Sequence, residues 1–179
     1  QGVGHYKGHP ALSAKIAAHW MQALRIDRAT KDRVCLLVRC HDERFDPGTI
    51  RVKQMLRRLG PEALKQLLWV QRADAIAKGD GKGASAAMKR IDAAEAELER
   101  ILREGECYSL ADLAVGGQDL LVCGLTPGPD VGRCLDRLLD KVIQGELPNR
   151  KEPLLDYAKD QWIPQMDSRP YRRNHLDED

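Results

Sequence analysis

The sequence predicts an all-α protein, a helical bundle made of two packed helical subdomains. Apolar residues recur at intervals of three and four positions along most of its 179 residues, which is the period of an amphipathic helix. No stretch alternates apolar and polar residues for long enough to predict a strand, and no Asn-Gly hairpin signal occurs. Glycine and proline stand at the ends of the periodic stretches, where helices start and stop.

Four helices are predicted in the first subdomain, over residues 10–24, 28–40, 50–59 and 61–77. Large apolar residues recur at intervals of four in the first helix: Leu12, Ile16, Trp20 and Leu24. Asp27 is a candidate N-cap for the second helix, because a carboxylate can accept the free N–H groups of a first turn. The pair Gly60-Pro61 predicts the end of the third helix and the start of the fourth.

A Gly-rich segment, "KGDGKGAS", predicts a linker at residues 78–84. It lacks the spacing G-x-x-x-x-G-K-[ST], and no strand precedes it, so it does not indicate a phosphate-binding loop. The linker would separate a first region, residues 1–77, from a second, residues 85–165. Residues 166–179 are expected to form a flexible tail.

The second region is predicted to begin with a long helix and to continue through shorter elements. Pro129 suits the first turn of a helix, Gly128 its cap, and Gly145 its end. The expected elements cover residues 85–104, 109–113, 118–123, 129–144 and 150–162.

Composition excludes few functions. The net charge of +2 is too small to indicate a nucleic-acid partner by itself, and no apolar run approaches the ~18 residues of a membrane span. The five cysteines are odd in number and form no C-x-x-C motif, which favours free thiols in the reducing cytoplasm over disulfides or zinc. Because the chain begins with Gln1 inside a Gly-rich stretch, we expect it to be a fragment of a longer protein.

The turn "TPGPDVG" is a candidate anion-binding site, because free N–H groups at a helix start can receive a phosphate oxygen. Gly128 lies in this turn, and Arg133, Arg137 and Lys141 follow at intervals of four, so they could track an RNA backbone by shape and charge. Three carboxylates are interleaved with them: Asp130, Asp136 and Asp140. The same pattern therefore also fits a capped helix with ordinary surface ion pairs.

Two segments resemble the tRNA nucleotidyltransferases, which are the CCA-adding enzymes and the related bacterial poly(A) polymerases. "GHPALSAKIA" followed by "VCLLVRCHD" looks like the later half of their HD-type helical region. Residues 108–155 resemble their C-terminal, tRNA-facing region, in which Gly-x-Asp-Leu precedes a Gly, a Pro-Gly-Pro-x-x-Gly turn, a Leu-rich helix and an Asn-Lys/Arg turn. The matching residues are Gly117, Asp119, Leu120, Gly124, Pro127, Gly128, Pro129, Gly132, Leu135, Leu139, Asn149 and Arg150.

The HD resemblance makes four residues candidate metal ligands: His9, His41, Asp42 and Asp74. Enzymes of that type hold a divalent metal that activates water, and they need more His and Asp ligands than these. The upstream ligands would precede this chain, so the set is incomplete. Alternatively, His41 and Asp42 simply end a helix, where a histidine suits the negative C-terminus.

The resemblance implies that the parent enzyme adds CMP and AMP to tRNA 3′ ends, using Mg²⁺ held by a nucleotidyltransferase head. No internal Asp-x-Asp pair follows a Gly-rich turn here, and the pair Asp177 and Asp179 has no third ligand nearby in sequence. We therefore expect this chain to bind tRNA without a cofactor of its own and without transferring nucleotides alone. Two other functions stay open: an HD-type metal-dependent phosphohydrolase and a non-catalytic helical interaction module.

Overall fold

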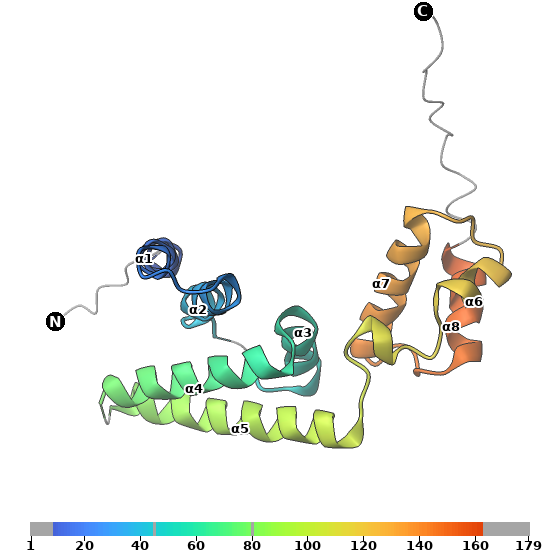
Figure 1. The fold of residues 1–179 in the computed structure, drawn as a ribbon. Helices are drawn as coiled ribbons and strands as arrows, with labels where there is room; N and C mark the ends of the chain where they lie inside the picture. Colours follow the sequence, from blue (N-terminus) through green and yellow to red (C-terminus); the bar gives the residue numbers. More distant parts are fainter. Residues whose placement is uncertain (1–8, 45, 80, 163–179) are drawn as a thin grey trace, which may run out of the picture. The chain divides into compact units, whose positions relative to one another are not determined.

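The computed structural model describes residues 9–44, 46–79 and 81–162. Within those residues the secondary structure is entirely helical, which confirms the predicted all-α class (Figure 1). The chain forms two compact units that divide after Gly105, here called the N-terminal unit and the C-terminal unit.

This division differs from the predicted linker at residues 78–84. The helix predicted from residue 85 already begins at Lys82, and it packs along the preceding helix as the second half of a hairpin (Figure 1). Lys78, Gly79 and Gly81 thus lie between the two helices of this hairpin, inside the N-terminal unit. The glycines that suggested a linker serve this turn, and Gly79 has a positive φ of 84°. The predicted tail at 166–179, with Asp177 and Asp179, lies outside the described residues.

The N-terminal unit contains five helices, and their bounds follow the sequence closely. They are α1 (His9–Ala23), α2 (Arg28–Cys40), α3 (Thr49–Leu59), α4 (Pro61–Ala77) and α5 (Lys82–Glu104). Asp27 caps α2 as predicted, since its Oδ1 accepts the N–H of Thr30 at 2.9 Å. Gly60 ends α3 with a φ of 76°, and Pro61 is the first residue of α4.

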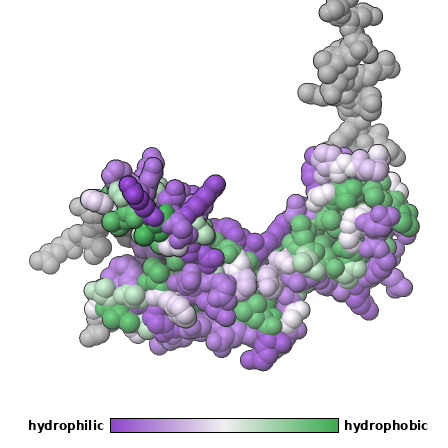
Figure 2. All heavy atoms as spheres, viewed as in Figure 1, coloured by the Kyte–Doolittle hydropathy of each residue, from purple (hydrophilic) through white to green (hydrophobic). Residues whose placement is uncertain are grey.

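Leucine-rich faces of α3, α4 and α5 form the core of this unit, where burial of apolar side chains is the main stabilising term. Its largest fully buried side chains are Val52, Met55, Leu56, Leu64, Leu67, Leu68, Leu98 and Ile101. Helix α1 packs against α2 through small residues such as Ala14. Its large apolar residues remain exposed, with Leu12 at 61% and Trp20 at 59%, and Figure 2 shows apolar surface in this part of the unit.

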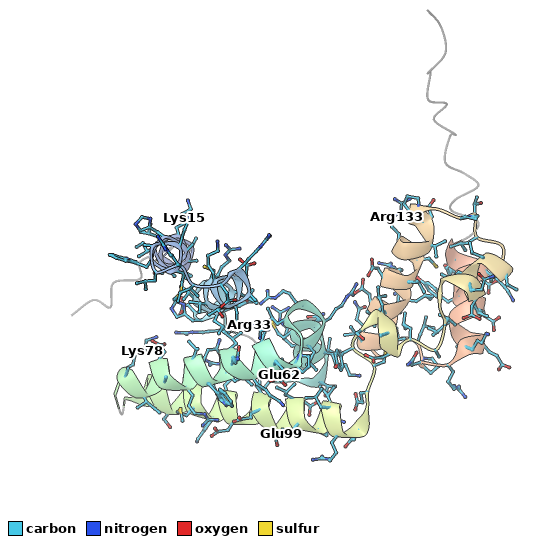
Figure 3. All side chains as sticks on the ribbon, viewed as in Figure 1. Lys15, Arg33, Glu62, Lys78, Glu99 and Arg133 are labelled. Carbon is cyan, nitrogen blue, oxygen red and sulfur yellow. The ribbon has the colours of Figure 1, made fainter. Side chains whose placement is uncertain are left out.

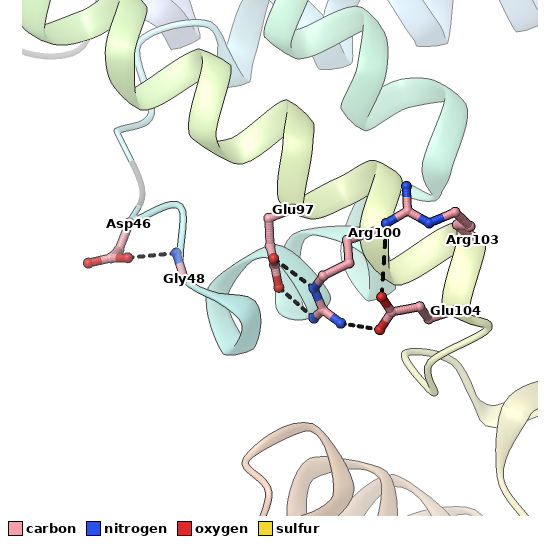
Figure 4. Close-up of polar contacts among 6 residues, drawn as sticks. All are labelled: Asp46, Gly48, Glu97, Arg100, Arg103 and Glu104. Atoms are coloured by element: carbon pink, nitrogen blue, oxygen red, sulfur yellow. Dashed lines mark hydrogen bonds and ion pairs between the residues drawn. The ribbon is translucent and has the colours of Figure 1, made fainter.

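A polar cluster of Glu97, Arg100 and Glu104 lies on α5 (Figure 4), and Glu97 also interacts with Thr49 and Lys53 of α3. The Arg100 guanidinium donates two hydrogen bonds to the Glu97 carboxylate, at 3.0 and 2.8 Å. The hydrogen bond from Arg100 holds the pKa of Glu97 at about 2, and a bond from Thr49 and the positive charge of Lys53 also favour the carboxylate. Lys53 is the buried charged residue of α3, so this network satisfies a group that would otherwise be costly to bury.

The C-terminal unit is smaller and is built around α7 (Pro129–Ile143). The other elements are a 3₁₀ turn η1 (Leu110–Asp112), α6 (Gly117–Val122), α8 (Lys151–Tyr157) and the π-helical turn η2 (Ala158–Trp162). The predicted apolar stripe of α7 is buried in their midst through Cys134, Leu138 and Leu139.

Candidate nucleic-acid interface

The turn before α7 has the conformation that its glycine and proline predicted. Gly128 is the N-cap, with φ 150° and ψ −170°, a region that side chains other than glycine avoid. Pro129 follows as the first helical residue, where its missing N–H costs nothing. Both residues are exposed, so the start of α7 is open to solvent.

Two polar side chains of the sequence pattern in residues 108–155, Asp119 and Asn149, hold the C-terminal unit together. The Asp119 carboxylate accepts the N–H of Gly116 at 2.9 Å and pairs with the Lys151 ammonium at 2.5 Å. The bond from Lys151, with the one from Gly116, lowers the pKa of Asp119. Asn149 accepts the N–H of Ala114 at 2.9 Å and donates to the carbonyl of Asp112 at 2.7 Å, which ties the turn before α8 to η1.

Other positions of that pattern also have structural reasons. Leu120 and Leu139 are fully buried, and Gly124 has a φ of 113°. A Cβ on Gly117 would lie 3.3 Å from the Val131 Cγ1, so a side chain there would crowd α7. Most of the pattern therefore specifies the fold of this unit, and its match does not by itself locate an RNA contact.

Gly132 is different, because the fold gives no reason for a glycine there. It lies in the first turns of α7, it is exposed, and a Cβ would meet nothing within 4 Å. Glycine inside a helix costs about 0.5–1 kcal/mol relative to alanine. A bare backbone at this position leaves room for another molecule to approach closely.

The three predicted RNA-binding cations lie on α7, and each contacts a polar partner in its own unit. Arg133, 53% exposed, pairs with Asp130 near the helix start (Figure 3). Lys141 pairs with Glu146. Arg137 hydrogen-bonds to Tyr157, and that bond raises the pKa of the guanidinium. Of the three interleaved acids, Asp130 forms one of these pairs, while the partners of Arg137 and Lys141 come from beyond α7.

No binding role was predicted for the first residues of α8, but the structure has a cavity beside them. A cavity of about 360 Å³ is lined by Arg150, Lys151 and three further residues of α8. Arg150 forms no ion pair with any residue that the structure describes. The adjacent basic residues at the start of the predicted helix over 150–162 were the signal that could have identified this surface.

Three of the four candidate metal ligands come together in the N-terminal unit. His41, Asp42 and Asp74 line one cavity of about 590 Å³, with the adjacent pair His41-Asp42 after α2 and Asp74 in α4. The side chain of His9 lies outside the described residues. Asp74 pairs with Lys78, and the His41 Nδ1 lies 2.7 Å from the Val38 carbonyl oxygen at the end of α2.

This arrangement matches the helix-end alternative for His41, which is the C-cap of α2. Over residues 9–44, 46–79 and 81–162, no group of three or more His, Cys, Asp or Glu side chains is placed to hold a metal ion. The described part of the chain also has no helix long and apolar enough to cross a membrane. All five cysteines are free thiols.

Comparison with known proteins places these features in a family. Residues 11–158 match the family described as tRNA nucleotidyltransferase domain 2. The CCA-adding enzyme of Latilactobacillus sakei is 51% identical over 49 residues, which are 27% of this chain and 12% of that enzyme. The CC-adding tRNA nucleotidyltransferase of Thermus thermophilus is 27% identical over 153 residues, which are 84% of this chain and 33% of that protein.

The CCA-adding enzyme of Limosilactobacillus fermentum is 34% identical over 86 residues, 48% of this chain and 20% of that enzyme. No solved structure matches the chain. The chain spans no more than about a third of the length of these relatives. Because the family match covers most of its residues, the chain belongs to the tRNA nucleotidyltransferase family.

Proposed function

We propose that this chain is the C-terminal, tRNA-holding part of a CCA-adding tRNA nucleotidyltransferase. The observation that carries the proposal is the family match over residues 11–158, supported by relatives whose names describe CCA or CC addition. The full-length protein would add CMP and AMP from CTP and ATP to tRNA 3′ ends, in the cytoplasm. A separate head with paired carboxylates would hold Mg²⁺, and this chain alone would not transfer nucleotides.

The helices would hold tRNA by shape and charge. The exposed start of α7 offers N–H donors, the Arg133 guanidinium and an uncovered backbone at Gly132. Cations at ion-paired positions can still bind a phosphate, since a surface pair contributes only about 0–1 kcal/mol and exchanges readily. The resulting affinity should be weak and should fall as salt rises, because each phosphate contact releases counterions.

A salt series with a tRNA transcript tests this proposal. Filter binding or mobility shift at low salt should show saturable binding whose logarithm falls linearly with the logarithm of salt concentration. Replacing Arg133 with Ala should weaken binding severalfold and make the salt slope less steep by about one unit. Arg103→Ala, which removes an exposed arginine from α5, is the matched control.

Two binding results would contradict the proposal. If the chain binds no tRNA even at low salt, it does not hold tRNA by itself. If the two arginine variants lose the same affinity, the attraction is diffuse and the start of α7 has no special part in it. Phosphodiester hydrolysis abolished by His41→Ala would instead favour the phosphohydrolase alternative.

A further inference from the structure

The N-terminal unit contains a cavity that the proposed function does not use. Its volume, about 590 Å³, falls within the roughly 300–1,000 Å³ typical of small-ligand sites. Three parts of the chain line it: the segment after α2, the last turns of α4 and the first turns of α5. Several of the α5 residues that line it are small, among them Gly83, Ala84 and Ala87, so their side chains take up little of the cavity volume.

Cationic side chains from all three parts line this cavity. Arg44 comes from the segment after α2, Lys78 from the end of α4 (Figure 3) and Arg90 from α5. Neither arginine forms an ion pair with a residue in the part of the chain that the structure describes. Arg90 is half-buried as a residue, and no described carboxylate pairs with it.

The acids in the cavity do not cancel this charge. Among the described lining residues, Asp74 is already paired with Lys78, and Asp42 is the other carboxylate beside the two arginines. The nearby Glu43 carboxylate is held by Arg58 through two bonds, at 3.0 and 2.5 Å, and does not appear in the lining. An anion placed between Arg44 and Arg90 would therefore meet a net positive environment.

We propose that this cavity binds a phosphate-bearing ligand of mononucleotide size, with Arg90 and Arg44 gripping the phosphate. A guanidinium offers paired N–H donors that fit phosphate oxygens. Arg44 and Arg90 line the cavity from two different segments and have no ion-pair partner among the described residues, so a phosphate suits this lining better than a metal or an apolar ligand does. The phosphate could belong to a free nucleotide or to a nucleotide within an RNA strand. The site is separate from the proposed tRNA contact on α7, because every lining residue belongs to the N-terminal unit.

Titration of the ¹⁵N-labelled full chain tests the site directly. The probes are adenosine 5′-monophosphate, adenosine as the control without phosphate, and a short single-stranded RNA. The amide signals of Gly81 and Gly83, which line the cavity, should shift saturably with the monophosphate and much less with adenosine. A shift seen only with the RNA would identify a strand as the source of the phosphate.

Matched variants then test which side chains bind the phosphate. Arg90→Gln should weaken binding roughly tenfold, the effect of one charge-assisted hydrogen bond. Lys89→Gln removes an exposed neighbouring charge outside the lining and should change it less than about twofold. Ala87→Leu keeps every charge and fills the cavity, so it should also abolish binding. Circular dichroism checks that each variant is folded.

Three results would overturn the proposal. One is the absence of any saturable shift with the monophosphate and with the RNA at millimolar concentrations. Another is equal binding of adenosine and its monophosphate, since the phosphate would then contribute nothing. The third is equal weakening by the two charge variants, which would reduce the effect to general surface charge. None of these results depends on whether the chain binds tRNA.

Discussion

Replacing Glu97 with Gln should destabilise the N-terminal unit, and the loss should depend on pH. Glu97 accepts both hydrogen bonds of the Arg100 fork and lies at the junction of α3 and α5 (Figure 4). Its pKa falls from 4.5 to about 2, chiefly through Arg100. At about 1.36 kcal/mol per unit of pKa, the ceiling is roughly 3 kcal/mol.

Solvent reduces that ceiling. The side chains of Glu97 and Arg100 are 18% and 30% exposed, so water partly screens their attraction. We expect Glu97→Gln to cost about 1–3 kcal/mol at neutral pH. Because the folded-state pKa is depressed, this contribution is present above about pH 4.5 and is lost as the pH falls toward 2. The wild-type chain and the variant should therefore become equally stable near pH 2.

Urea denaturation followed by circular dichroism, repeated between pH 2 and pH 7, measures this difference. The control is Glu99→Gln on the same helix, whose carboxylate faces solvent (Figure 3) and should contribute little at any pH. A Glu97 variant that loses the same free energy at pH 2 as at pH 7 would refute the electrostatic account. So would a loss at neutral pH no larger than that of the Glu99 control.

Four further predictions concern the C-terminal unit. In thermal melts, Gly128→Ala should destabilise the C-terminal unit by about 1–3 kcal/mol because of the backbone conformation of Gly128. Gly132→Ala should instead stabilise the unit by about 0.5–1 kcal/mol. If Gly132→Ala also leaves tRNA affinity unchanged, close approach of RNA at this position is excluded. Asn149→Ala should cost about 1–2 kcal/mol by removing both bonds to the η1 region, and an unchanged melting temperature would contradict that role. Burial raises the pKa of Cys134 to about 11, so its thiol should resist alkylation at pH 8. Mass spectrometry should find Cys134 unmodified while the half-buried Cys123 reacts. Early labelling of Cys134 would show that α7 opens.

Local signals in the sequence were sufficient to predict where the helices begin and end. The Asp27 cap, the Gly60-Pro61 junction and the apolar stripe of α7 each act over a few residues, so their interpretation did not require knowledge of the rest of the fold. The family resemblance was confirmed, and its more specific part is a pattern in residues 108–155 that can likewise be read without knowledge of the fold. That pattern turned out mostly to describe how the C-terminal unit is built.

Features that depend on distant residues could not be predicted in this way. The boundary after Gly105 arises because α5 packs on α4, a contact that composition around residues 78–84 cannot reveal. Likewise, spacing along α7 left open whether its cations would bind RNA or form surface ion pairs, and the partners of Arg137 and Lys141, Tyr157 and Glu146, lie beyond the helix itself.

The sequence by itself determined the helical class, most helix ends and the family of this protein, because those properties are encoded in short-range periodicity and motif. Tertiary structure alone decided which charges remain available. It paired the cations of α7 with neighbouring groups, and it left Arg44 and Arg90 facing a cavity without a carboxylate partner among the described residues. The physical reason is that charge pairing depends on distances of a few ångströms between side chains, and only folding sets those distances.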